Sequence, residues 1–261
     1  MVESAGALAG RHAIVTGASR GIGAAIAAAM AAEGARVSLL GRDAARLQAV
    51  SEAAGGPDRA TPIRADVAVS ESVREAFAAA RRTFGPVHFL INNAGLAPAA
   101  RFTDTDEALW HRVLGVNLTG TFLCTREAVA DMLRDGFGRI VNIASTAGLR
   151  GAAYIAAYTA SKHAVIGLTR ALALEYATRN ITVNAVCPGY TDTDIVKQAV
   201  GNISAKTGRS EQEALDALLA TNPQRRLIEP GEVAHAVLWL CRPGTESVTG
   251  QSIVIAGGEV T

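Results

Sequence analysis

The sequence predicts an α/β fold in which a doubly wound parallel sheet of about seven strands carries helices on both faces. Short apolar runs rich in β-branched residues alternate along the chain with longer stretches of helical character. Most of these runs are continuous rather than alternating, which is typical of strands buried on both faces. No repeat, low-complexity linker or change in composition divides the chain, so we predict a single domain over residues 1–261.

The first half of the chain alternates strands and helices regularly. The predicted strands are 12–17, 35–41, 60–66 and 87–93. Each is a short apolar run bounded by Gly, Asp or Asn. The predicted helices are 22–34, 43–53 and 70–85. The first of these ends at a glycine, which is typical of helix C-termini.

The second half has longer helices and one break in the pattern. A helix over 106–134 precedes a strand over 138–145, and a helix over 154–178 precedes a strand over 181–187. Residues 188–229 interrupt this order, apart from an amphipathic helix in 210–221 with Leu215, Leu218 and Leu219 facing inward. The last strand is expected within 247–258.

Composition excludes several classes of function. The chain of 261 residues has a net charge of +1, so nothing indicates a nucleic-acid or anionic-membrane partner. No apolar run approaches the roughly 18 residues of a membrane span. The start lacks a secretory pattern, and the three cysteines form no CxxC pair. We therefore expect a cytoplasmic protein with a small-molecule substrate, and no metal site, since the histidines show no ligand spacing.

A glycine-rich loop joins the first predicted strand to the first helix. Gly17, Gly21 and Gly23 allow a tight turn and a close approach of the backbone to a phosphate. The N-terminus of the following helix then offers unpaired N–H groups to a pyrophosphate. The alternative is a loop whose glycines serve only the turn. Its position at a strand–helix junction favours a dinucleotide site.

Several motifs together give the chain a family resemblance. Besides Thr16-Gly17-x-x-x-Gly21-x-Gly23, they are NNAG at 92–95, VNLTG around Asn117, Ser145, a YxxxK formed by Tyr158 and Lys162, and PGYTDT at 188–193. In this order, over nearly the whole chain, they resemble the short-chain dehydrogenase/reductase family. The resemblance implies a Rossmann-type fold and an NAD(P)(H)-dependent oxidoreductase that interconverts a ketone and a secondary alcohol.

The resemblance also implies a set of residues that bind the cofactor. They are Gly17, Ser19, Arg20, Gly21, Ile22, Gly23, Arg42, Asp66, Val67, Asn93, Ala94, Gly95, Tyr158, Lys162, Pro188, Gly189, Thr191 and Thr193. Within this set, Asp66 and Val67 match the pair that contacts the adenine. Asp66 could equally cap the helix that begins near Ser70.

The end of the second strand bears on the choice of cofactor. Enzymes that prefer NAD usually carry an acidic residue there to bind the ribose 2′-hydroxyl, whereas this chain has Gly41 and Arg42. Arg20 lies in the glycine loop, and two guanidinium groups would suit a 2′-phosphate. We therefore favour NADP(H) over NAD(H). The alternative is that Arg42 is only solvated and Asp43 only caps a helix.

Four residues are the candidate catalytic set. Reduction of a ketone needs a proton donor at the carbonyl oxygen, and free tyrosine has a pKa of roughly 10. A nearby Lys162 ammonium would lower the pKa of Tyr158, and Ser145 would stabilise the charge that develops on the oxygen. The resemblance implies that Asn117 holds a distortion of its helix. It also implies that Asn117 holds a water that links Lys162 to solvent.

Tyr154, Tyr158 and Lys162 follow one another at intervals of four residues, so on a helix they would lie on one face. Ser145 precedes Tyr158 by the offset found in the family, which favours Tyr158 as the acid. Tyr154 is then expected to form a wall of the substrate pocket. The predicted substrate contacts are therefore Ser145, Tyr154 and Tyr158.

Residues 190–226 are longer than an ordinary connection, and the family resemblance implies that this segment folds over the substrate as a lid. With the preceding CPGY, this segment resembles 3-oxoacyl thioester reductases, polyketide ketoreductases and 3-hydroxybutyrate dehydrogenases. We favour NADPH-dependent reduction of a 3-oxoacyl thioester or related ketone. The alternatives are an NAD-linked catabolic alcohol or 3-hydroxy acid dehydrogenase and a non-catalytic dinucleotide sensor. The resemblance further implies a homotetramer that uses the two long helices.

Overall fold

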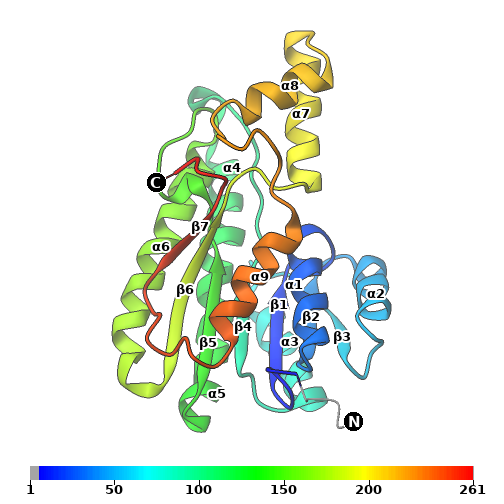
Figure 1. Ribbon diagram of the computed structural model, residues 1–261, viewed down its shortest axis with the longest axis vertical. Helices are drawn as coiled ribbons and strands as arrows, with labels where there is room; N and C mark the ends of the chain where they lie inside the picture. Colours follow the sequence, from blue (N-terminus) through cyan, green and yellow to red (C-terminus); the bar gives the residue numbers. More distant parts are fainter. Residues whose placement is uncertain (1–5, 261) are drawn as a thin grey trace.

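The computed structural model describes residues 6–260, in which seven parallel strands form one sheet (Figure 1). The strand order is β3-β2-β1-β4-β5-β6-β7. The strands are β1 (His12–Thr16), β2 (Arg36–Gly41), β3 (Ala60–Arg64), β4 (Phe89–Asn92), β5 (Gly138–Ile143), β6 (Ile181–Pro188) and β7 (Ser252–Ile255). The predicted fold class is confirmed.

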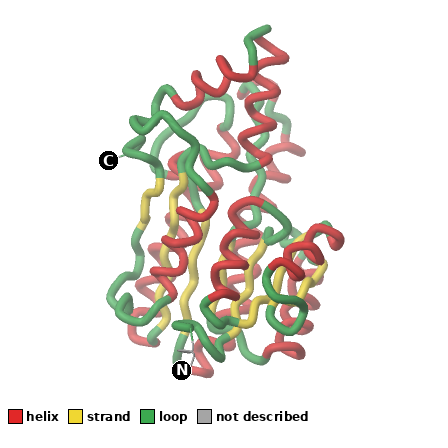
Figure 2. The backbone as a smooth tube through the Cα atoms, turned by 45° about the vertical axis from the view of Figure 1, so that its right-hand side comes forward, coloured by secondary structure: helices red, strands yellow, loops and turns green. Residues whose placement is uncertain are grey.

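Helices cover both faces of this sheet (Figures 1 and 2). On one face α1 (Gly21–Ala32) and α9 (Pro230–Cys241) lie side by side, with α2 (Ala44–Ala53) near the sheet edge. The other face carries α3 (Ser70–Phe84), α4 (Glu107–Leu114), α5 (Gly120–Asp135) and α6 (Ala156–Tyr176).

The core consists of two main clusters, one on each face of the sheet. Val15 of β1 packs in the cluster that contains Met30 of α1 and Val237 of α9. Its neighbour Ile14 belongs to the cluster with Phe77 of α3 and Met132 of α5. Successive strand residues point to opposite faces of the sheet. Because helices cover both faces, the residues on either face must be apolar. This is why the strands read as continuous apolar runs.

The connections reverse direction at the centre of the sheet. Strand β1 pairs with β2 on one side and with β4 on the other, both in parallel. The loops that follow β1 and β4 therefore lead away from each other and leave a crevice at the carboxyl ends of these strands. The glycine loop and the NNAG segment meet at this point.

Two predicted helices differ from the structure. The helix expected over 106–134 is interrupted by a π-helical turn, Gly115–Thr119, between α4 and α5. The helix expected from residue 154 begins only at Ala156, after Ile155 in a non-helical conformation. The apolar periodicity continues through both places, so it does not reveal either change.

The predicted lid region forms two helices that project beyond the carboxyl end of the sheet (Figures 1 and 2). Helix α8 (Glu211–Leu219) was predicted, and its leucines are partly or fully buried. Helix α7 (Asp194–Thr207) was not predicted; it packs Val196 and Val200 against Ala214 of α8. None of the helices in residues 6–260 has the length and apolar character needed to cross a membrane.

Candidate active site

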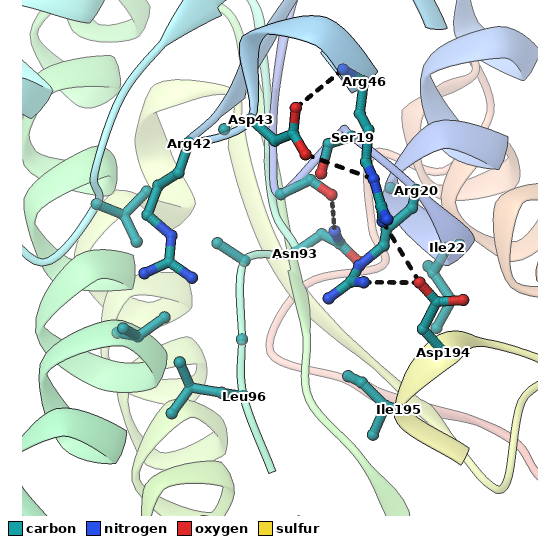
Figure 3. A pocket seen from close by; sticks show the side chains of 18 of the residues that line it. Ser19, Arg20, Ile22, Arg42, Asp43, Arg46, Asn93, Leu96, Asp194 and Ile195 are labelled. Atoms are coloured by element: carbon teal, nitrogen blue, oxygen red, sulfur yellow. Dashed lines mark hydrogen bonds and ion pairs between the residues drawn. The ribbon is translucent and has the colours of Figure 1, made fainter. Parts of the chain in front are cut away.

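A cleft of about 430 Å³ opens at the carboxyl ends of the central strands (Figure 3). It is lined by the glycine loop, the ends of β2 and β4, the segment after β3 and the start of α7. The predicted cofactor residues in its lining are Gly17, Ser19, Arg20, Gly21, Ile22, Gly23, Arg42, Asp66, Val67, Asn93, Ala94, Gly95 and Thr193. Tyr158, Lys162, Pro188, Gly189 and Thr191 lie outside this lining.

The floor of the cleft is bare backbone held in place by Asn93. A Cβ on Gly17 would lie 2.8 Å from the Cα of Ala94, and one on Gly23 would lie 2.3 Å from the carbonyl oxygen of Gly17. The Asn93 amide donates to the carbonyl oxygens of Thr16 and Gly17, at 2.9 and 3.1 Å. No side chain caps α1, so its first N–H groups can receive a phosphate. These features fit a dinucleotide cofactor.

Charged side chains gather at the outer end of the cleft (Figure 3). Arg20 donates to Asp194 of α7 at 2.6 Å, and Arg46 reaches the same oxygen at 3.5 Å. Arg46 also lies 3.4 Å from Asp43. Arg42 lies on the opposite side of the cleft, pointing away from Asp194. Sequence reasoning missed Arg46; its place in the first turn of α2, four residues after Arg42, was the available signal.

The two aspartates at strand ends have different local roles. Asp43 caps α2 by accepting a hydrogen bond from the Arg46 amide at 3.1 Å, so the capping alternative holds for Asp43. Asp66 instead accepts from the Ala68 amide at 3.0 Å, which closes a local turn. The cap residue of α3 is Val69, so the capping alternative for Asp66 is wrong.

Ser145, Tyr158 and Lys162 come together where β5 ends and α6 begins. The Lys162 ammonium donates to the Ile143 carbonyl oxygen at 2.7 Å and lies 5.6 Å from the centre of the Tyr158 ring. The Ser145 hydroxyl oxygen accepts from the Ala147 amide at 3.1 Å, which caps a short 3₁₀ turn. The sequence offset of thirteen residues thus brings a hydroxyl, a phenol and an ammonium to one site.

The pKa of Tyr158 differs from the sequence-based expectation. Burial raises the pKa of Tyr158, and hydrogen bonding with Ser145 opposes this only in part. Burial also lowers the pKa of Lys162 to about 8, with the Cys187 thiol acting in the opposite direction. The expected lowering of the Tyr158 pKa by Lys162 is therefore wrong for this structure. Desolvation dominates both groups, and it makes the Tyr158 phenol a weaker acid than free tyrosine.

Asn117 links the site to the loop after β4. It is 1% exposed, and its side chain exchanges two hydrogen bonds with the backbone of Leu96, at 2.9 and 3.0 Å. Its amide also donates to the Ser161 hydroxyl at 3.0 Å, and Ser161 donates to the Tyr158 carbonyl oxygen at 2.6 Å. The π-helical turn therefore carries Asn117 toward the tyrosine helix. Ser161 was missed, since a serine beside Lys162 has no distinctive spacing.

Tyr154 does not share a helix face with Tyr158 and Lys162. It precedes α6, has a backbone φ of +67° and is 66% exposed. Its carbonyl oxygen accepts a hydrogen bond from the Ala100 amide at 2.8 Å. The predicted column of three is therefore wrong in its geometry. Contact between Tyr154 and substrate stays a prediction.

The segment after β6 leads into α7 and contacts the glycine loop. The hydroxyls of Thr191 and Thr193 donate to the carbonyl oxygens of Gly189 and Thr191, at 3.1 and 3.2 Å. The methyl group of Thr193 lies 3.0 Å from where a Cβ on Gly21 would stand. Thr193 lines the cleft, whereas Thr191 is buried and lies outside the lining.

Comparisons with known proteins agree with this architecture. The family described as "short chain dehydrogenase" matches residues 11–203. The putative ketoacyl reductase 1 of the granaticin polyketide synthase from Streptomyces violaceoruber is 41% identical over 94% of this chain and 92% of its own length. Acetoacetyl-CoA reductase from Rhizobium meliloti (strain 1021) is 38% identical over 95% of this chain and 98% of its own.

A solved structure gives the same result in three dimensions. The crystal structure of a single-residue variant of the actinorhodin polyketide ketoreductase with NADPH superposes with a TM-score of 0.92 at 39% identity, covering 98% of this chain and 99% of that one. With the parallel sheet, the glycine cradle and the Ser145, Tyr158 and Lys162 cluster already described, these matches settle the family. The chain belongs to the short-chain dehydrogenase/reductase family and is an oxidoreductase that acts on CH–OH groups.

Proposed function

We propose that the protein reduces a ketone to a secondary alcohol with NADPH, and that the ketone is a 3-oxoacyl thioester or a close relative. The supporting observation is the set of arginines in the nucleotide cleft. Arg20, Arg42 and Arg46 line it together with Asp43, Asp66 and Asp194, and Gly41 stands at the end of β2, where an acidic residue would bind a free ribose 2′-hydroxyl. Guanidinium groups suit a phosphate, and the lack of an acid at position 41 removes one repulsion.

The cleft and the catalytic cluster have complementary tasks. The glycine cradle, with residues 93–95, would hold the dinucleotide, which supplies the hydride when bound. Tyr158, a neutral phenol whose hydrogen bond with Ser145 opposes the rise of its pKa, donates its proton to the carbonyl oxygen as negative charge develops there. Ser145 donates a hydrogen bond to the same oxygen and stabilises that charge.

Lys162 and Asn117 act behind the tyrosine. The Lys162 ammonium stabilises the phenolate that remains after proton donation, and its pKa of about 8 allows it to exchange protons near neutral pH. Asn117 holds the 93–96 loop and α6 together through Leu96 and Ser161. Its proposed further role is to hold the water through which protons return to Lys162.

The relatives support the proposed substrate class, which is the finer part of the proposal. A ketoacyl reductase and an acetoacetyl-CoA reductase, by their names, act on 3-oxoacyl groups, and both cover nearly the whole chain. Helices α7 and α8 project beyond the carboxyl end of the sheet (Figure 1), and a substrate cover at that end is the role we propose for them. The lid's mixed charges give no separate indication of an acidic carrier.

Tyr158→Phe tests the mechanism. Turnover of acetoacetyl-CoA with NADPH should fall at least about a hundredfold, because general acid catalysis typically contributes that much or more. NADPH binding should stay within about twofold, since Tyr158 is outside the cleft lining. Steady-state kinetics and a binding titration measure the two quantities. Near-normal turnover in the variant would refute the catalytic assignment.

A panel of acyl thioesters, 3-oxo acids and cyclic or aryl ketones, run with NADPH and NADH, tests the substrate and the cofactor. A higher kcat/KM with NADPH on thioesters is the expected result. A strong preference for NADH would instead favour the catabolic alcohol or 3-hydroxy acid dehydrogenase. No turnover with any member would favour a non-catalytic dinucleotide sensor.

A further inference from the structure

The carboxylate of Asp194 holds two of the three cleft arginines. Its Oδ2 atom accepts from Arg20 Nη1 at 2.6 Å and lies 3.5 Å from Arg46 Nη1. The three residues come from the glycine loop, α2 and the first turn of α7, which are far apart in the sequence (Figure 3). All three line the same cleft. Ion pairs of Asp194 thus join the first turn of α7 to the nucleotide cleft.

Two guanidinium groups converging on one oxygen form the arrangement that also binds a phosphate. The side chains of all three residues are about half exposed, so the ion pairs are exchangeable rather than locked in the core. The pKa of Asp194 is lowered, mainly by its hydrogen bond from Arg20, so it is a carboxylate at neutral pH. A second anion at these arginines would meet repulsion from it.

We propose that Asp194 is a specificity-determining residue, whose carboxylate occupies Arg20 and Arg46 until the 2′-phosphate of the cofactor displaces it. This inference rests on the proposed binding of NADP(H) in the cleft and adds a competitor from the lid. A cofactor without the 2′-phosphate leaves the ion pairs intact. Only a cofactor that carries the 2′-phosphate therefore releases the first turn of α7. The identity of the cofactor and the position of α7 are coupled in this way.

The competition predicts a gain of affinity in Asp194→Asn. Removing the carboxylate frees Arg20 and leaves Arg46 with only its contact to Asp43, so adenosine 2′,5′-bisphosphate should bind about threefold to tenfold more tightly, because one exposed ion pair changes an equilibrium constant by up to about fivefold. 5′-AMP should change less than about twofold. Loss of a negative charge from the first turn of α7 would only weaken that helix. A gain in affinity therefore cannot come from the helix itself.

The chain offers a matched control in the same segment. Asp192 pairs with Lys197 at 3.2 Å and is not part of the cleft lining. Asp192→Asn should leave the affinity for both nucleotides unchanged. In an Arg46→Gln background, the gain from Asp194→Asn should shrink, because part of the competition acts through Arg46. Raising the salt concentration should also reduce the gain in affinity, because salt screens the attraction between the exposed charges.

Isothermal titration of the whole protein with the two nucleotides separates this inference from the proposed function. The wild-type preference for the bisphosphate over 5′-AMP tests the cofactor proposal. The change of that preference in Asp194→Asn tests the competition, whatever the wild-type value. A selective gain for the bisphosphate supports it. Weaker binding, an equal change for both nucleotides, or the same gain in Asp192→Asn would overturn it.

Discussion

At the scale of single residues, the cleft depends on glycines, because the lack of a Cβ lets two backbone segments approach closely. Gly23 faces the carbonyl oxygen of Gly17 and the amide of Asn93, and a Cβ there would lie 2.3 and 2.5 Å from these atoms. The first contact is with backbone, which cannot rotate away. The glycine spacing alone predicted this loop, because few other residues permit such close approach. The spacing could not predict that the Asn93 amide holds the loop from across the crevice.

Gly23→Ala should therefore damage both binding and stability. We expect NADPH affinity to fall at least about tenfold and the free energy of unfolding to fall by about 1–3 kcal/mol, because the loop must shift to admit the methyl group. Nucleotide titration and urea unfolding measure these effects. Gly231→Ala in α9 is the matched control, since a Cβ there meets no atom within 4 Å. Equal effects of the two substitutions would contradict the steric argument.

At the scale of elements, buried polar groups fix how neighbours meet. His12 of β1 lies 2.9 Å from the Ser38 hydroxyl of β2 and 2.9 Å from the Gly85 carbonyl oxygen at the end of α3. Burial lowers the pKa of His12 from 6.5 to about 4. The pKa of neighbouring His88 is also lowered by burial. The folded state therefore favours the neutral form of both rings, so the free energy of unfolding depends on pH.

His12→Gln should flatten the acid side of the stability profile. The unfolded chain binds the proton near pH 6.5 and the folded chain only near pH 4, so stability is full above 6.5 and is lost as the pH falls through this window. The loss corresponds to about 3 kcal/mol. Urea unfolding at several pH values from 7 to 4 measures it. His235→Gln, at an exposed position of α9, should keep the wild-type slope. If the pH dependence were unchanged in His12→Gln, groups other than His12 would cause the loss of stability at acid pH.

At the scale of the whole molecule, two helices carry exposed apolar side chains. Phe122 of α5 is 46% exposed and Leu174 of α6 is 82% exposed, and both helices lie on the same side of the sheet. Exposed large apolar groups are candidates for burial between subunits. The family resemblance places the subunit contacts of a tetramer on the same two helices. We therefore propose this face as the contact between copies.

Phe122→Asp and Leu174→Asp should each shift the assembly toward smaller species, because a buried carboxylate at a contact is costly. Light scattering coupled to size exclusion, at micromolar protein, measures the mass. Val69→Asp is the control: Val69 is 49% exposed, close to Phe122, but precedes α3 and lies on neither α5 nor α6. A wild-type monomer, or an unchanged mass in both variants, would remove the proposed contact.

The sequence by itself determined the order of the strands, the parallel sheet and the glycine loop, because buried strands and tight turns each impose a local pattern of residues. The family resemblance added the expectation that Ser145, Tyr158 and Lys162 act at one site. The resemblance also implied a helix distortion at Asn117, which the structure shows as a π-helical turn. Only the tertiary structure decided the start of α6 after Tyr154, the raised pKa of Tyr158 and the pairing of Arg20 with Asp194. These depend on burial and on contacts between distant segments, which no local pattern records.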